Sequence, residues 1–455
     1  MITDALAGLL TKTPESAFSE ATIDKTKIHV LDTIGVSLAG ARSFETQKML
    51  EVLQPSGGEG HCAVWGTSYS TNARTAALIN GVSAHAYELD DSGGCDHSGA
   101  VVIPAAIAAL ADISEPVTGA AFLRSIILGY EVGRRVLEAA GGYETHNGRG
   151  WHSTGTCGVF GATAAVGSLL KLNTHDLSSA LGTACSFAAG TWAFIGNGSS
   201  AKKLHSGRAA EAGVLASYLA RSGFKGPEAV FEPDQWGSFF ATYCGDQADP
   251  QTLIRDYGVF WRINRCSIKP YATCRGTHSA IDAINLIFEK DGVSASNVAK
   301  IEVGMSAFQF AMCGSKSVMT RAQAQMSLPY AIAARLHFGK VFLDELANNA
   351  WEAPEIAQWL DKMTIDIDKT MADEDEPEVR IMTHSGAEHR QVVEAPLGGP
   401  DNPLSVEQIT GKYHDLSKAI LPLAQVNAIR ERILNLENIP DVRALLPLLQ
   451  SPMQN

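Results

Sequence analysis

The segment from His85 to Gly99, HAYELDDSGGCDHSG, concentrates side chains that can exchange protons. Within it, His97 and Ser92 lie close to four carboxylates, which are Glu88, Asp90, Asp91 and Asp96. The Gly93-Gly94 pair predicts a turn, so we expect this cluster to form a loop after a helix. A carboxylate beside a histidine can fix the tautomer of the ring and raise its basicity, which suits general acid–base catalysis. The alternative is an acidic loop exposed to solvent.

A metal site is a weaker interpretation of the same loop. Cys95, Asp96 and His97 offer ligand atoms, but consecutive residues do not easily enclose one ion. The eight cysteines are widely scattered and form no C-x-x-C pair. That spacing excludes the common zinc-ribbon and ferredoxin-type patterns, so we expect no metal.

Two stretches carry cations and no acidic residue at all. The first runs from Leu177 to Ala210 and the second from Tyr257 to Ile281. Their basic residues are Lys202, Lys203, His205 and Arg208 in the first, and Arg262, Arg265, Lys269, Arg275 and His278 in the second. In a chain of net charge −13, two such stretches predict a local pocket for an anion. The alternative is that these residues pair with carboxylates elsewhere or lie on a solvated face.

A third segment, WHSTGTCGVFGATAA from Trp151, places His152 just before a helix of small residues. Ser153 or Thr154 could cap that helix, whose N-terminal amides would then favour a carboxylate. The segment GNGSSAKK from Gly196 lacks the second glycine and the final Ser or Thr of a phosphate-binding loop. We find no G-x-G-x-x-G after a strand and no G-x-S-x-G, so we expect no nucleotide cofactor.

The pattern that must position these residues is helical up to about residue 265. Leu31, Ile34 and Leu38 recur at helical spacing, for example, and Asn173 or Thr174 could cap a later helix. Alternating segments appear only between 297 and 395, at 299–303, 363–367 and 379–393, and the last of these predicts a hairpin. Helical pattern returns near Val406. We therefore predict a mainly α protein, a large all-helical domain interrupted by a smaller α+β domain.

Composition narrows the partners of this chain of 455 residues. With 36 Lys plus Arg against 49 Asp plus Glu, it lacks the basic surface that nucleic acids and anionic membranes require. The N-terminus has no basic region before its apolar residues, so we expect no signal peptide. We therefore expect a cytoplasmic protein with reduced cysteines, bound to neither nucleic acid nor membrane.

Taken together, these segments resemble the MmgE/PrpD family, which includes 2-methylcitrate dehydratase, cis-aconitate decarboxylase and iminodisuccinate epimerase. The resemblance rests on LDTIGVSLAG, HAYELDDSGGCDHSG, GYEVGRRV, GRGWHSTGTCGVFGA, KKLHSGRAAEAG, GFKGP with EAVFE, KPYATCRGTHSAIDA and SLPYAIA, in this order along nearly the whole chain. It implies a helical domain of residues 1–265 plus 396–455, an α+β lid of residues 266–395, and an active site between them. It also implies a homodimer and catalysis without a metal, nucleotide or flavin.

The resemblance also assigns residues to the site. Asp91 and Ser92 look like the family's Asp–Thr pair, and His97, His152 and Lys202 match its other catalytic positions. The remaining residues expected to contact substrate are Glu88, His205, Lys269, Arg275, His278 and Tyr330. Glu88, Ser92 and Ser98 depart from the frequent Asp, Thr and Pro of the family.

The predicted reaction is the dehydration of a β-hydroxy acid that carries two or three carboxylates. Lys202 or His152 would remove the proton α to a carboxylate, and His97, oriented by Asp91, would protonate the leaving hydroxyl. Fixed cations would stabilise the developing charge. The alternatives are decarboxylation of a cis-aconitate-type substrate, epimerisation of an iminodisuccinate-type substrate, and a helical protein that binds carboxylates without catalysis. His152 argues against epimerisation, because that subgroup has a tyrosine near this position.

Overall fold

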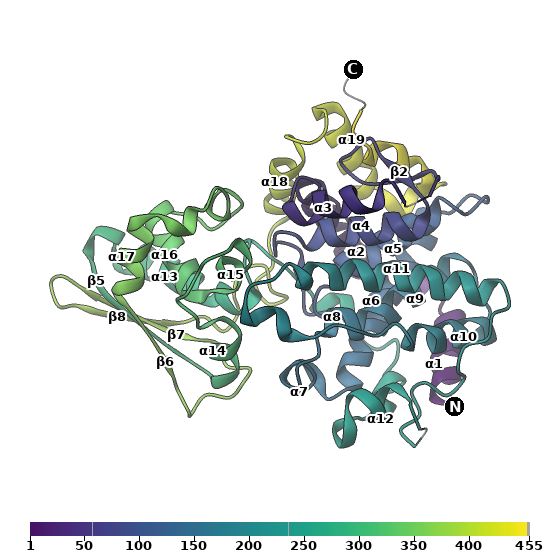
Figure 1. The fold of residues 1–455 in the computed structure, drawn as a ribbon, viewed down its shortest axis with the longest axis horizontal. Helices are drawn as coiled ribbons and strands as arrows, with labels where there is room; N and C mark the ends of the chain where they lie inside the picture. Colours follow the sequence, from purple (N-terminus) through teal and green to yellow (C-terminus); the bar gives the residue numbers. More distant parts are fainter. Residues whose placement is uncertain (57, 235, 453–455) are drawn as a thin grey trace.

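Helices dominate the computed structural model, which describes residues 1–56, 58–234 and 236–452 (Figure 1). A body of helices is built from both ends of the chain. Its helices are α1 (Ile2–Lys12), α2 (Glu20–Gly40), α3 (Phe44–Leu53), α4 (Ala73–His85), α5 (Gly99–Leu110), α6 (Gly119–Ala139), α7 (Gly142–Gly148), α8 (Ser153–Thr156), α9 (Gly158–Leu169), α10 (Thr174–Cys185), α11 (Ala201–Arg221), α12 (Phe239–Tyr243), α18 (Val406–Ser417) and α19 (Leu423–Leu434). The prediction of a mainly α protein is confirmed.

Small residues let the body helices approach closely. A Cβ at Gly81 of α4 would lie 2.8 Å from the Cα of Gly207 in α11, and a Cβ at Gly161 of α9 would lie 2.7 Å from the carbonyl oxygen of Gly129 in α6. The hydroxyl of Ser206 also donates to the carbonyl oxygen of Gly81 at 2.9 Å. Close packing of α4 against α11 brings the C-terminal end of α4 to the N-terminal end of α11. This contact joins the acidic loop to the first basic stretch.

The second part of the fold is a four-stranded sheet with its own helices, which lies at the left of Figure 1, whereas both termini lie on the helical body. Its strands, in the order β6-β5-β7-β8, are β6 (Met363–Ile367), β5 (Val298–Met305), β7 (Glu378–Thr383) and β8 (Glu388–Val392). The helices of this region are α13 (His278–Asp291), α14 (Ala307–Cys313), α15 (Arg321–Met326), α16 (Leu328–Phe338) and α17 (Pro354–Asp361). The predicted strands and the β7–β8 hairpin are confirmed. The sheet has a hydrophobic core separate from that of the body, while the domain boundaries at 265/266 and 395/396 stay predictions.

Two local expectations were wrong. The body is not purely helical, because it contains the short pairs β1 (Cys62–Ala63) with β2 (Ser70–Thr71), and β3 (Asp91–Ser92) with β4 (Ser267–Ile268). Helix α8 is capped neither by Ser153 nor by Thr154, because its N-cap residue is His152 and no side chain caps it. The β3–β4 pair matters for function because it ties the acidic loop to the second basic stretch.

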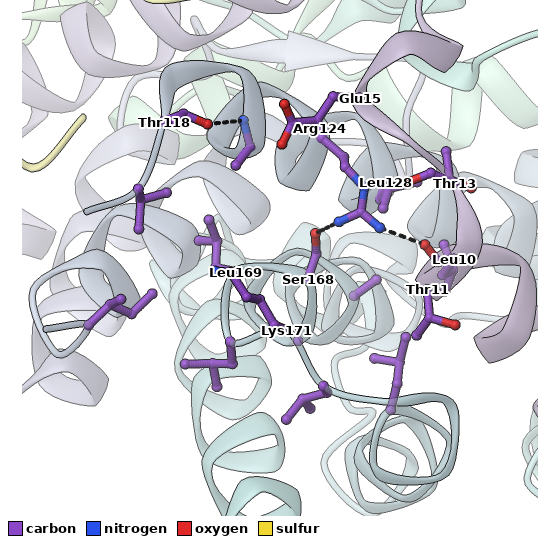
Figure 2. Close-up of a pocket in the computed structure, with 18 of the residues that line it drawn as sticks. Leu10, Thr11, Thr13, Glu15, Thr118, Arg124, Leu128, Ser168, Leu169 and Lys171 are labelled. Atoms are coloured by element: carbon purple, nitrogen blue, oxygen red, sulfur yellow. Dashed lines mark hydrogen bonds between the residues drawn. The ribbon is translucent and has the colours of Figure 1, made fainter. Parts of the chain in front are cut away.

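No helix among the described residues is long and apolar enough to span a membrane. The body contains a cavity of about 1030 Å³ between α1, α6 and α9 (Figure 2). The guanidinium of Arg124 in that cavity donates to the carbonyl oxygens of Thr13 and Leu10 and to the hydroxyl of Ser168. The described residues that line this cavity include no histidine and no cysteine, so it lacks the acid–base side chains that the sequence singled out.

Candidate active site

A second cavity, of about 780 Å³, lies where the acidic loop meets both basic stretches. Six of the predicted site residues line it, namely Glu88, Ser92, His97, Lys202, Lys269 and Arg275. The other five, Asp91, His152, His205, His278 and Tyr330, do not. The two basic stretches therefore contribute cations to one cavity, as the sequence predicted.

Glu88 lies among the lysines Lys202, Lys203 and Lys269 at the bottom of the cavity, and we call these four residues the floor of the cavity. One carboxylate oxygen lies 2.7 Å from Nζ of Lys202 and also contacts Lys203, and the other lies 3.4 Å from Nζ of Lys269. Burial alone would raise the pKa of Glu88, but the ammonium groups of Lys202 and Lys203 hold it well below its ordinary value. One ionised carboxylate thus faces three ammonium groups. Around Glu88 the ammonium groups outnumber the carboxylate, which suits an anionic ligand at this point of the cavity. The rest of the lining also carries carboxylates, among them Glu374 and Glu376.

The backbone at Glu88 is also unusual. Its φ of +53° lies in the left-handed region, which residues other than glycine seldom adopt. The residue is completely buried. Such a conformation persists only where surrounding contacts determine it, and here the three lysines provide them.

His97 lies between carboxylates at the wall of the cavity. Its Nδ1 lies 3.0 Å from Oδ2 of Asp90 and 3.0 Å from the carbonyl oxygen of Asp91, and its Nε2 lies 3.3 Å from Oδ2 of Asp96. Burial would lower the pKa of His97, but the carboxylates of Asp96 and Asp90 raise it above its ordinary value. The imidazolium form can donate a proton, which is the role of a general acid.

The carboxylate of Asp91 points away from this wall. It accepts hydrogen bonds from the Tyr130 hydroxyl at 2.7 Å and from the Gly99 amide at 2.9 Å, and it lies 3.3 Å from Nδ1 of His29. The prediction that this carboxylate orients His97 is therefore wrong, and Asp90 takes its place. Neighbouring residues of an extended segment point to opposite faces, so only one of two adjacent aspartates can face His97.

His152 lies behind Asp96 and pairs with His205. The two Nδ1 atoms are 2.9 Å apart, and Nε2 of His152 lies 3.7 Å from Oδ2 of Asp96. Burial, with Lys202 nearby, lowers the pKa of His152 well below its ordinary value and that of His205 to about 4. Both rings are therefore neutral at pH 7. Neither one lines the cavity.

Two further predicted residues lie outside the cavity. Nε2 of His278 is 3.2 Å from the carbonyl oxygen of Thr273, and burial lowers the pKa of this histidine well below its ordinary value. The hydroxyl of Tyr330 donates to the carbonyl oxygen of Glu345. These side chains support the segments around the site and do not face the cavity.

Several residues near the site were not assigned a role from sequence. Asp90 and Asp96 belong to the acidic cluster, but only the structure distinguishes them from Asp91. Lys203 was one of the cations that predicted the pocket. Lys412 of α18 contacts the backbone of the site and carried no local signal in the sequence.

Two groups of the described residues could bring three ligand atoms to one ion. They are His85 with Asp90 and His97, and Asp96 with His97 and His152. Both depend on His97, whose two ring nitrogens already face carboxylates, as expected for a hydrogen-bonded imidazolium. We therefore assign no metal to these residues.

Comparison with known proteins decides the family. The model of the MmgE/PrpD N-terminal domain matches residues 4–251, which is more than half of the chain, and that of the MmgE/PrpD C-terminal domain matches residues 271–438. The chain belongs to the MmgE/PrpD family. The resemblance noted from its motifs is thereby confirmed.

Curated relatives within the MmgE/PrpD family cover nearly the whole chain. A cis-aconitate decarboxylase-like protein (oryM) of Aspergillus oryzae is 28% identical, over 99% of this chain and 98% of its own length. The cis-aconitate decarboxylase of Aspergillus terreus is also 28% identical, over 95% and 92%. The cis-aconitate decarboxylase of Homo sapiens is 23% identical, over 99% and 95%.

Proposed function

We propose that this protein is a cofactor-independent carboxy-lyase that acts on a tricarboxylate of the cis-aconitate type. The observation that carries the proposal is a floor of lysines and a histidine cation in one cavity. The names of the relatives support decarboxylation, which the sequence offered as the alternative to dehydration. Dehydration stays a prediction and is one outcome of the test below. A homodimer and a cytoplasmic location also stay predictions.

The cavity has enough cations to bind several carboxylates. Lys202 and Lys269 lie on its floor, and Arg275 lies on its wall, where Glu376 accepts one hydrogen bond from it at 2.6 Å. Guanidinium groups have further donors, so Arg275 can bind a substrate carboxylate while it keeps Glu376. Charged hydrogen bonds to a carboxylate are among the stronger ones.

The reaction breaks one C–C bond and consumes one proton. The carboxylate on the saturated carbon leaves as CO₂, its electron pair enters the neighbouring C=C system, and the double bond moves by one carbon. Negative charge then builds on the carbon beside another carboxylate, where the lysines stabilise it. That carbon takes a proton from Nε2 of His97. A tricarboxylate and one proton thus give CO₂ and a dicarboxylate with a terminal methylidene group.

The test is proton NMR in D₂O on the purified protein with cis-aconitate, citrate, 2-methylcitrate and iminodisuccinate. We expect new methylidene signals from cis-aconitate, with one deuterium in each product molecule. We expect His97→Gln to slow this reaction by about a hundredfold or more, the usual contribution of a general acid. The matched control, His337→Gln, changes an exposed histidine and should retain the wild-type rate.

Other spectra would overturn the proposal. New vinyl signals from a hydroxy acid would establish a dehydratase. Deuterium uptake without net conversion would establish an epimerase. A silent panel, with thermal stabilisation by the tricarboxylates, would indicate a binding protein.

A further inference from the structure

Lys412 is a buried cation that the proposed reaction does not use. It lies on α18, and its Nζ has three oxygen neighbours, which are Oδ1 of Asp32 at 2.7 Å and the carbonyl oxygens of Leu89 at 2.6 Å and Lys269 at 2.9 Å. An ammonium group has three donors, so each can be used. Lys412 does not line the cavity.

The two carbonyl groups belong to the two segments that form the floor of the cavity. Leu89 follows Glu88 in the acidic loop, and Lys269 is itself a floor residue. Nζ of Lys269 returns to Glu88, at 3.1 Å from its carbonyl oxygen and 3.4 Å from its carboxylate. One ammonium group therefore bonds to the backbones of both segments, next to the point where the side chains of Glu88 and Lys269 meet.

We propose that Lys412 is a positioning residue that sets the spacing between Glu88 and Lys269, and thereby the affinity of the cavity for substrate carboxylates. This inference rests on the proposed function of the cavity as a carboxylate site. Asp32 of α2 anchors the ammonium group from the body side. The other two hydrogen bonds of Lys412, to the carbonyl oxygens of Leu89 and Lys269, hold the backbone of the site.

If Lys412 only stabilised the fold, an uncharged pair of side chains could replace Lys412 and Asp32. A buried ion pair can often be replaced by apolar side chains of similar volume without loss of stability. The double variant Asp32→Asn with Lys412→Met removes both charges and leaves no unpaired carboxylate. It therefore separates stability from positioning, and the single variant Lys412→Met provides a second measurement.

The experiment measures steady-state kinetics with cis-aconitate and calorimetric binding of the same tricarboxylate. For both variants we expect KM and the dissociation constant to rise by about tenfold, roughly the affinity of one lost hydrogen bond to a charged group. We expect kcat to change far less, because His97 and its carboxylates are untouched. The matched control is Lys27→Met, which removes another buried lysine, paired with Asp24 at 2.8 Å and Glu437 at 2.9 Å. It should lower the thermal midpoint and leave KM unchanged.

Two results would overturn the inference. One is wild-type affinity in the folded double variant, and the other is an equal rise in KM for Lys27→Met. If the wild type binds the tricarboxylate without turning it over, the proposed reaction fails. Weaker binding by the Lys412 variants would still support the positioning role in that case, so the two failures are distinguishable.

Discussion

His97 has its two ring nitrogens between carboxylates, with Asp90 near Nδ1 and Asp96 near Nε2. This arrangement raises the pKa of the ring above 6.5, so the cation persists at a pH where an ordinary histidine is half neutral. A general acid must start each turnover protonated. As the proposed proton donor, His97 should therefore shape the pH dependence of the rate through its own titration.

We expect kcat to be constant below the pKa of His97 and to fall as the pH rises through it, at an apparent pKa above 6.5. The rate falls at high pH because the active form is the imidazolium cation, which loses its proton there. Asp96→Asn removes one of the carboxylates that raise this pKa, so the alkaline limb should move to lower pH. The measurement is kcat as a function of pH for both proteins. An unchanged limb in the variant would exclude His97 as the group that titrates.

The neighbours Asp90 and Asp91 should give opposite phenotypes. We expect Asp90→Asn to lower kcat by about tenfold or more, because one pKa unit of lost stabilisation of the imidazolium is worth about 1.4 kcal/mol. Asp91→Asn should instead destabilise the fold by about 1–3 kcal/mol, since its carboxylate accepts hydrogen bonds from Tyr130 and Gly99. Urea titrations and kcat measurements on both variants check this. Equal losses of kcat would contradict the separation.

For single residues, the sequence predicted which side chains belong to the site more successfully than it predicted how they are arranged. Glu88, His97, Lys202 and Lys269 could be named because their types and motifs are distinctive. The choice between Asp90 and Asp91 could not be made, since it depends on which face of a short extended segment meets the cavity. His205 was expected to touch substrate, but its partner is His152.

Among the elements, α4 and α11 pack closely and bring two parts of the site together. Helix α11 carries Lys202 and Lys203 at its first turn, and α4 leads into the acidic loop. Their backbones approach at Gly81 and Gly207, where a side chain would not fit. A Cβ at Gly207 would lie 2.3 Å from the carbonyl oxygen of Leu78.

We expect Gly207→Ala to destabilise the protein by about 1–3 kcal/mol, because overpacking forces the two helices apart. It should also weaken substrate binding, since Lys202 moves with α11. The matched control is Gly411→Ala in α18, where a Cβ would meet no atom within 4 Å. That change should stabilise by about 0.5–1 kcal/mol, because alanine favours the helix. Chemical denaturation of both variants tests the difference, and two stabilised proteins would refute the packing argument.

Periodicity predicted several of the long elements. Alternating residues such as Ile301 and Val303 marked β5, and Asn173 caps α10, one of the two caps expected there. The strands β1 to β4 are only two residues long, too short to show any alternation. The cap of α8 was misjudged because Ser153 is already inside the helix.

At the scale of the whole molecule, contacts between distant segments hold the sheet region to the body beside the site. Arg321 of α15 pairs with Glu45 of α3, and its guanidinium lies 5.1 Å from the ring centroid of Tyr87. Tyr87 immediately precedes Glu88. This contact therefore connects the two regions at the edge of the acidic loop.

We expect Arg321→Met to speed hydrogen exchange in the acidic loop, because Glu45 loses its partner and Tyr87 loses a cation over its ring. Exchange in β5 and β7 should stay as in the wild type, since the core of the sheet is untouched. The control is Arg390→Met, which removes a more exposed arginine that pairs with Glu378 on the sheet. Hydrogen exchange is measured by mass spectrometry on the wild type and on both variants. Uniformly faster exchange would indicate global destabilisation instead of a local contact.

Because the ribosome makes the chain from its N-terminus, the Lys412 contact can form only late in synthesis. All strands of the sheet and the helices around it lie between residues 278 and 392, so that region can fold while the last helices of the body are still unmade. Lys412 emerges more than three hundred residues after Asp32. Until then, Asp32 and the carbonyl groups of Leu89 and Lys269 lack this ammonium partner. Lys412 therefore reaches the two segments of the cavity floor only near the end of synthesis, and a nascent chain that stops before α18 lacks this additional contact between them.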